Sequence, residues 1–166
     1  RIGMPQLELG AFATSVISTS SAAGTRSADV ASMTGTNFSS WYNQTQGTFV
    51  VKARMSAPAI SAYGPYRIDD GTDTQRVMLR DSGGGLLGFV IIDGGVTQAN
   101  LSAGNTITAN ALFSHAAAYQ LNDIATSYNG AAVLTDNAAT IPAVNRMLIG
   151  VGGTTTSYLN GWIQSI

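Results

Sequence analysis

The sequence predicts an all-β fold, an antiparallel two-sheet sandwich or jelly roll. Apolar and polar residues alternate with a period of two in the readable segments, and Gly, Asn and Asp interrupt them at short spacing. No long amphipathic helix is visible in the pattern. Short strands joined by such turns pack as two sheets around one core, and 166 residues suffice for one domain.

The first expected strands lie in the middle of the chain. Residues 47–55 alternate after a break at Gly47, and residues 75–81 place two arginines and a methionine on one face. Residues 86–92 form a continuous apolar run between glycines, which is typical of a strand buried on both faces. We expect a tight turn directly after it, at 93–95.

The later strands are expected in the second half of the chain. Residues 111–121 are rich in alanine, which favours helix, but their neighbours are closely spaced strands, so we predict a strand here as well. Residues 124–128 and 131–135 flank Asn129-Gly130, the strongest hairpin signal in the sequence. A last strand is expected at 158–164.

Composition excludes several classes of function. The chain has 8 Lys and Arg against 9 Asp and Glu, so it has no basic surface for nucleic acid or anionic lipid. No apolar run is long enough to insert into a membrane. Cysteine is absent, which removes disulfides, thiolate metal sites and cysteine nucleophiles.

Both ends of the sequence are abrupt, so we expect a fragment of a longer protein. Residues 1–17 are interpreted as the end of a preceding module or the junction from it. Residues 18–166 are interpreted as the jelly-roll domain, with truncation at its C-terminus left open.

Five stretches in a fixed order carry a family resemblance. They are Pro5–Glu8 with Gly10–Ser15, Thr25–Arg26 with Ala28–Asp29, Asn37–Asn43 with Gly47–Phe49, Ala117–Tyr119 with Asn122–Asp123 and Asn129–Gly130, and Leu148–Gly150 with Leu159–Ile163. Together they resemble bacteriophage and prophage proteins that carry a concanavalin A-like, laminin G-like jelly roll. The sequence departs from that pattern at Gln46, where the family often has an acidic residue, and after Ile163, where it has a basic run.

The resemblance implies a structural protein of the virion, located in the tail, a fibre or another host-facing appendage. It further implies a homo-oligomer, a trimer if the protein belongs to a fibre, with other virion proteins as partners. The fold is otherwise used for sugar recognition, but one fold hosts many functions, so contact with host surface glycan is left open. The alternative is a carbohydrate-binding module of a phage or bacterial surface protein. A glycan hydrolase is disfavoured because it needs two carboxylates, and Glu8 is the single glutamate.

Four aromatic residues are candidates for stacking on sugar rings: Trp41, Tyr42, Tyr63 and Tyr66. The Gly64-Pro65 turn should present the last two outward. Core packing is the competing interpretation for each of them. It is the preferred one for Trp41, and also for Trp162, which lies in an apolar terminal strand.

Asp69, Asp70 and Asp73 could supply oxygen ligands to a calcium ion. We favour a simple turn, in which Asp side chains accept hydrogen bonds from nearby backbone N–H groups, because the full calcium-loop spacing is absent. No cofactor is otherwise expected. His115 has no second histidine to share a metal with and is expected to be structural.

Overall fold

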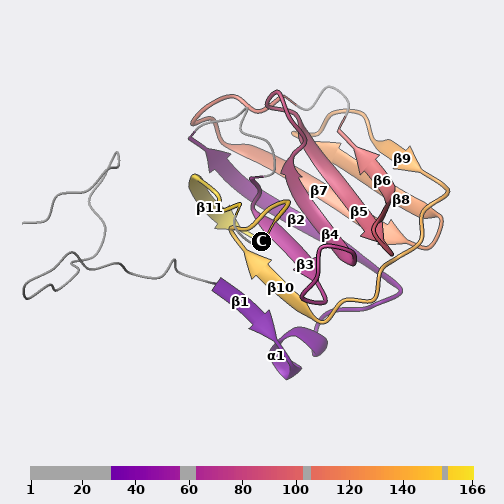
Figure 1. Ribbon diagram of the computed structural model, residues 1–166. Helices are drawn as coiled ribbons and strands as arrows, with labels where there is room; N and C mark the ends of the chain where they lie inside the picture. The colour runs from indigo at the N-terminus through magenta and orange to yellow at the C-terminus, as the bar shows by residue number, and fades with distance from the viewer. Residues whose placement is uncertain (1–30, 57–62, 103–105, 155–156) are drawn as a thin grey trace, which may run out of the picture. The chain divides into compact units, whose positions relative to one another are not determined.

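Two antiparallel sheets lie face to face in the structure, a computed structural model that describes residues 31–56, 63–102, 106–154 and 157–166 (Figure 1). Sheet A has the strand order β1-β10-β3-β4-β5-β6, and sheet B has the order β11-β2-β7-β8-β9. The strand bounds are β1 Ala31–Thr34, β2 Gln46–Met55, β3 Tyr66–Asp69, β4 Arg76–Asp81, β5 Leu87–Asp93, β6 Val96–Leu101, β7 Phe113–Gln120, β8 Asp123–Tyr128, β9 Leu134–Asp136, β10 Arg146–Ile149 and β11 Gly161–Ser165. The predicted fold class is confirmed.

All seven predicted strands are present as β2, β4, β5, β7, β8, β9 and β11. The alanine-rich segment is strand β7, as predicted. Four further strands, β1, β3, β6 and β10, were not predicted, and α1 (Thr36–Ser39) is a single helical turn. The expected module boundary between residues 17 and 18 lies outside the described residues.

Two of the predicted turns adopt the backbone conformation that glycine and asparagine favour. Gly94 and Gly95 both have positive φ, 60° and 80°, and join β5 to β6 in the two-residue turn that was expected. Asn129 and Gly130 also have positive φ, and the N–H of Ala131 donates to the Tyr128 carbonyl. Strand β9 begins only at Leu134, however, so the predicted start of that strand at residue 131 is wrong.

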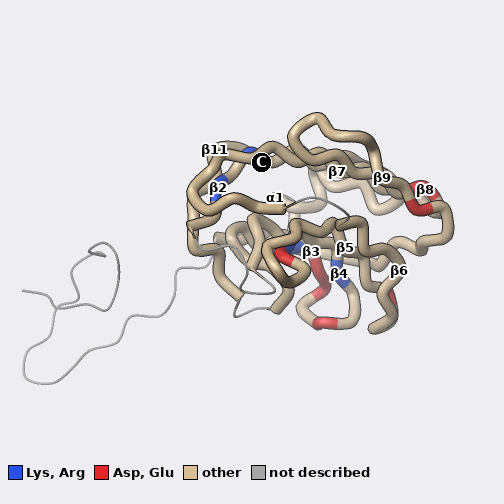
Figure 2. The backbone as a smooth tube through the Cα atoms, turned by 90° about the horizontal axis from the view of Figure 1, so that it is seen from above, with Lys and Arg blue, Asp and Glu red and all other residues tan. Residues whose placement is uncertain are grey.

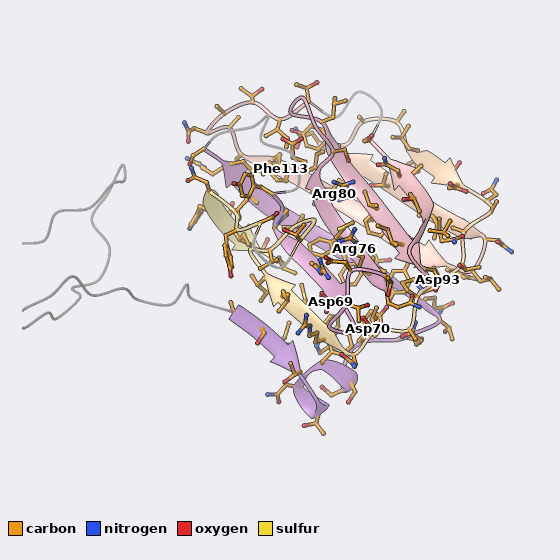
Figure 3. All side chains as sticks on the ribbon, in the orientation of Figure 1. Asp69, Asp70, Arg76, Arg80, Asp93 and Phe113 are labelled. Atoms are coloured by element: carbon orange, nitrogen blue, oxygen red, sulfur yellow. The ribbon has the colours of Figure 1, made fainter. Side chains whose placement is uncertain are left out.

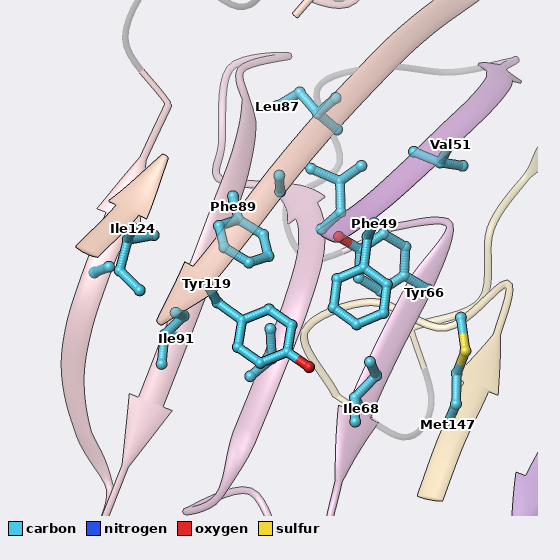
Figure 4. Packing of buried hydrophobic residues seen from close by; sticks show 14 of the residues in the cluster. Phe49, Val51, Tyr66, Ile68, Leu87, Phe89, Ile91, Tyr119, Ile124 and Met147 are labelled. Atoms are coloured by element: carbon cyan, nitrogen blue, oxygen red, sulfur yellow. The ribbon is translucent and has the colours of Figure 1, made fainter. Parts of the chain in front are cut away.

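Side chains from the inner faces of the two sheets form the core (Figure 4). Phe49 of β2 packs between Tyr66 of β3 and Tyr119 of β7, with ring centroids 5.2 Å and 5.6 Å away. Aromatic pairs of this kind add about 0.5–1.5 kcal/mol each beyond their buried area. The aromatic contact between Phe49 and Tyr66 therefore ties sheet B to sheet A.

Sheet A is also buried on its outer side. Met78 of β4 and Val90 and Ile92 of β5 form a second apolar cluster there, and each is less than a tenth exposed. Strand β5 is thus buried on both faces, as its continuous apolar run predicted. Among the described residues, no helix is long and apolar enough to cross a membrane.

Candidate functional site

The outer face of sheet A holds four of the chain's eight lysine and arginine side chains. They are Arg67 of β3, Arg76 and Arg80 of β4, and Arg146 of β10; we call this surface the arginine face. The alternation of each strand turns these residues away from the core. Figure 2 shows that the charged positions of sheet A gather at β3 and β4, whereas most of the backbone is uncharged.

Arg67 is completely buried, and four of the five N–H donors of its guanidinium bond to the protein. Its Nε donates to the Asp69 carboxylate, Nη1 donates to Asp73 Oδ1 (2.7 Å) and to the Gly153 carbonyl (3.1 Å), and Nη2 donates to the Thr72 carbonyl (2.6 Å). A guanidinium held this way fixes the β3–β4 turn and the loop around Gly153 in place.

The aspartates of the β3–β4 turn form the hydrogen bonds expected of a simple turn. Asp69 Oδ1 accepts from the backbone N–H of Gly71 (2.9 Å), and Asp70 Oδ1 accepts from the backbone N–H of Thr72 (2.8 Å). The Thr72 hydroxyl also donates to Asp70, and this bond lowers the pKa of that carboxyl. The predicted backbone hydrogen bonds are therefore present at Asp69 and Asp70, whereas Asp73 bonds to Arg67 and Arg76 instead.

Arginines occupy the carboxylates that a calcium ion would need. Asp69 accepts from Arg67 and from Arg146 Nε, and Asp73 accepts from Arg67 and from Arg76 Nη1. In the part of the chain that the structure describes, no group of three His, Asp or Glu side chains is arranged to hold a metal. Nearby guanidinium charges also oppose a divalent cation.

Arg76 and Arg80, labelled in Figure 3, form fewer hydrogen bonds to described residues than Arg67 does. Arg76 Nη1 donates to Asp73 (3.1 Å) and to the Gly153 carbonyl, but its Nε is buried without an acceptor. Burial, followed by the charge of Arg67, lowers the pKa of Arg76. Arg80 forms no ion pair with any described residue, and its Nε is likewise buried without an acceptor.

Polar side chains converge beside Arg80, over Gly88. In the sheet register Arg80 lies opposite Gly88 of β5. A side chain at Gly88 would collide with the Ser82 hydroxyl and would come within 3.1 Å of Asn100 Oδ1 of β6. The glycine thus lets a hydroxyl and an amide approach β5 opposite the position of Arg80, which has no acidic partner among the described residues. Sequence reasoning missed this cluster, although a glycine inside an apolar strand signals a close approach of this kind.

The two tyrosines beside the Gly64-Pro65 turn do not form an exposed pair. Tyr66 is completely buried, so the prediction that it faces outward is wrong. It is the first residue of β3, and its ring points between the sheets toward Phe49. Tyr63 is partly buried and packs against the core. Neither arrangement provides the paired platform that the sequence suggested.

Trp41 and Tyr42 lie at the edge of the sandwich, after α1. Tyr42 stacks on Phe38 with ring centroids 4.6 Å apart, and Trp41 is 45% exposed. Tyr42 lines a groove of about 600 Å³ together with Asn145 and Arg146; we call it the rim groove. Because Arg146 also bonds to Asp69, the rim groove borders the arginine face.

Trp162 is not part of the core, and that prediction is wrong. It is 52% exposed on the outer face of sheet B, and the Arg54 guanidinium lies 5.6 Å from its ring centroid. Its strand neighbour Ile163, opposite Ala53, is the residue that turns inward. The terminal strand thus turns Ile163 toward the core and Trp162 away from it, which is the reverse of the predicted orientation.

His115 is buried between the sheets. Its Nε2 lies 2.6 Å from the Thr126 hydroxyl, and burial lowers its pKa from 6.5 to about 4. The ring is therefore neutral at physiological pH. It serves as a hydrogen-bonded core residue, in agreement with the structural role expected for it.

No protein-family model and no curated protein sequence matches this chain. Solved structures do resemble it. The CBM40 of a Ruminococcus gnavus IT-sialidase, bound to α2,3-sialyllactose, aligns with a TM-score of 0.60 at 16% identity, covering 73% of each chain. Mouse laminin α1 domains LG4-5 align with a TM-score of 0.56 at 16% identity, covering 72% of this chain and 34% of theirs. These likenesses establish the fold, a concanavalin A-like jelly roll.

Proposed function

We propose that this domain is a non-catalytic carbohydrate-binding module that takes its glycan on the arginine face. The observation behind the proposal is the cluster beside Gly88, where Arg80 lacks an acidic partner and Ser82 and Asn100 contribute a hydroxyl and an amide. Sugar hydroxyls are recognised by such donors and acceptors in fixed positions. The fold likeness to a carbohydrate-binding module in complex with sialyllactose supports the proposal.

The state of the carboxylates supports a binding role over a catalytic one. Glycoside hydrolysis uses one carboxylic acid that protonates the leaving group and a second carboxylate opposite it. On the arginine face, Asp69 and Asp73 accept hydrogen bonds from arginines, and the lowered pKa of Asp70 makes it a poor acid. Glu8 lies outside the described residues.

The location of the domain in a virion rests on the sequence resemblance alone. A glycan-binding head on a tail, fibre or other host-facing appendage would be compatible with the arginine face. The genes that flank the full-length reading frame test this part of the proposal: neighbouring tail genes are expected. A sugar-degradation or secretion locus would favour a bacterial surface protein.

A glycan array with the full 166-residue chain tests the binding function. We expect binding to a defined set of glycans and a loss of at least tenfold in affinity for Arg80→Ala and for Asn100→Ala. Arg54→Ala is the matched control, because Arg54 lies on the outer face of sheet B. Binding that depends on Arg54 and not on Arg80, or no binding at all, would contradict the proposal.

A further inference from the structure

Charge is unevenly compensated along the arginine face. Near the β3–β4 turn, Arg67, Arg76 and Arg146 share the carboxylates of Asp69 and Asp73. Arg80 lies four residues beyond Arg76 on β4, which corresponds to about 13 Å in an extended strand. Among the described residues, no carboxylate forms an ion pair with Arg80.

Arg80 is also partly removed from water. Its Nε is buried without an acceptor among the described residues, and Met78, two positions earlier on the same face, is completely buried. Burying an N–H group without an acceptor costs free energy, and the cost is larger when the N–H belongs to a charged group than when it belongs to a neutral one. In such surroundings an oxyanion gains more from a guanidinium than it would in bulk water.

The polar side chains near Gly88 could form hydrogen bonds with the hydroxyl groups of a sugar. The Ser82 hydroxyl and the Asn100 amide come together over Gly88, opposite Arg80. Ser82 Oγ lies 3.5 Å from Asn100 Oδ1, at the limit of a hydrogen bond, so both groups retain bonding capacity. A cation beside a hydroxyl and an amide matches a sugar that carries an acidic group next to its own hydroxyls.

We infer that the glycan bound on this face is acidic and that its carboxylate or sulfate group binds the terminal nitrogens of Arg80. The planar guanidinium matches two oxygens of one oxyanion at once, which a lysine ammonium does not. Ser82 and Asn100 then recognise hydroxyls of the same sugar. This inference rests on the proposed carbohydrate-binding function and names the substrate class for the same site.

Calorimetric titration of the full chain with matched sugars tests the inference. The probes are lactose, sialyllactose, a glucuronate-bearing disaccharide and sulfated lactose. We expect the acidic probes to bind at least tenfold more tightly than lactose at low salt, with that advantage shrinking as NaCl is raised. Comparing the affinities for sialyllactose and the glucuronate disaccharide with the affinity for sulfated lactose shows whether a carboxylate or a sulfate is preferred.

Variants assign the preference to Arg80. Arg80→Gln should abolish the advantage of the acidic probes, and Arg80→Lys should recover only part of it. Arg54→Gln, on sheet B, should leave it intact. Equal affinity for neutral and acidic probes would overturn the inference and leave the binding function standing. Binding to none of the probes or array glycans would overturn the binding function itself. The wild-type comparison needs no variant, so it holds even if Arg80→Gln fails to fold.

Discussion

Arg67 and Asp69 form an ion pair on the outer side of sheet A in which neither side chain is exposed. They stand two residues apart on β3, so their side chains project from the same face of the strand. The pair joins the β3–β4 turn and the loop around Gly153 through the other donors of Arg67. The pair anchors the arginine face at the β3–β4 turn, whereas Arg80, near the other end of β4, forms no ion pair with any described residue.

Removing the Asp69 carboxylate should destabilise the fold strongly. Asp69→Ala removes one of the two carboxylates that bind the buried Arg67 and also the partner of Arg146, and breaking a buried ion pair costs about 3–5 kcal/mol. We expect a decrease of that size in the free energy of unfolding, measured by urea denaturation. Asp70→Ala is the matched control, because Asp70 is far less buried and should cost much less.

The double variant Arg67→Met with Asp69→Leu separates charge burial from packing. Replacing both members of a buried pair with apolar residues is often neutral or stabilising. We expect the double variant to recover most of the stability that Asp69→Ala loses. An Asp69→Ala protein as stable as wild type would show that the pair does not hold the turn.

Calcium should not change the stability of the domain. The oxygens of Asp69 and Asp73 accept hydrogen bonds from Arg67, Arg76 and Arg146, so a cation would have to displace guanidinium groups. The melting temperature should be the same in EDTA and in millimolar CaCl₂. A rise of several degrees with calcium would indicate binding to the native state and would reverse this interpretation.

Acidification should destabilise the domain through His115. Burial holds its folded pKa at about 4, below the ordinary 6.5, so the unfolded chain binds an additional proton between these values. The contribution of neutral His115 to the free energy of unfolding is complete above pH 6.5. It is lost as the pH falls toward 4, on the order of 3 kcal/mol in total. Asp70, with a pKa below 3.8, titrates beneath this window.

Thermal unfolding between pH 7 and pH 4.5 measures the effect. His115→Gln retains a hydrogen-bonding side chain without a titrating ring, so its melting temperature should vary less over this range. A wild-type melting temperature that is flat from pH 7 to pH 4.5 would contradict a buried neutral histidine.

Truncating Phe113 should lower the free energy of unfolding much more than truncating Trp162. Phe113→Ala removes a ring that is 2% exposed and stacks on Tyr128, so it should cost about 3–5 kcal/mol. Trp162→Ala removes a ring that is 52% exposed and should cost less than about 1 kcal/mol. Urea denaturation of both variants checks the placement; a large loss for Trp162→Ala would restore the core interpretation.

The strands that the sequence predicted are those whose pattern is local. β2 alternates cleanly and β5 is apolar up to Asp93, so period and composition are enough for these two, whereas β7 was predicted from its closely spaced neighbours. β3 reads Tyr-Arg-Ile-Asp and is buried at all four positions. Its charges are tolerated because Arg67 and Asp69 neutralise each other and bond to distant loops, and a single-sequence pattern does not reveal such partners.

The candidate site was predicted less well than the fold for the same reason. Tyr66 was judged by the turn beside it, but its orientation depends on the alternation of β3, which was not predicted. The cluster at Arg80 brings together residues of β4, β5 and β6 through strand register. Strand register is set by pairing across the sheet. The sequence around Asn100 therefore did not show where this side chain lies in the fold.

Self-association through the outer face of sheet B is the last prediction. Val50 and Trp162 of this face are both more than half exposed, and the chain has few charges to keep copies apart. The phage resemblance independently implies repeated copies around a symmetry axis. We expect a homo-oligomer that buries more than about 1,000 Å² in total, measured by light scattering at increasing concentration.

Val50→Lys should shift the protein toward monomer, because it adds a third positive charge to a face of sheet B that already carries Lys52 and Arg54. Val96→Lys is the matched control: Val96 is 61% exposed but belongs to β6 of sheet A, so the oligomer should persist. A flanking segment that drives assembly would mask the effect in the isolated chain, so the full-length protein is the decisive sample. If the domain is monomeric there, with sheet B uncovered, the structural role fails, and a solitary glycan-binding head that uses the arginine face becomes the better account.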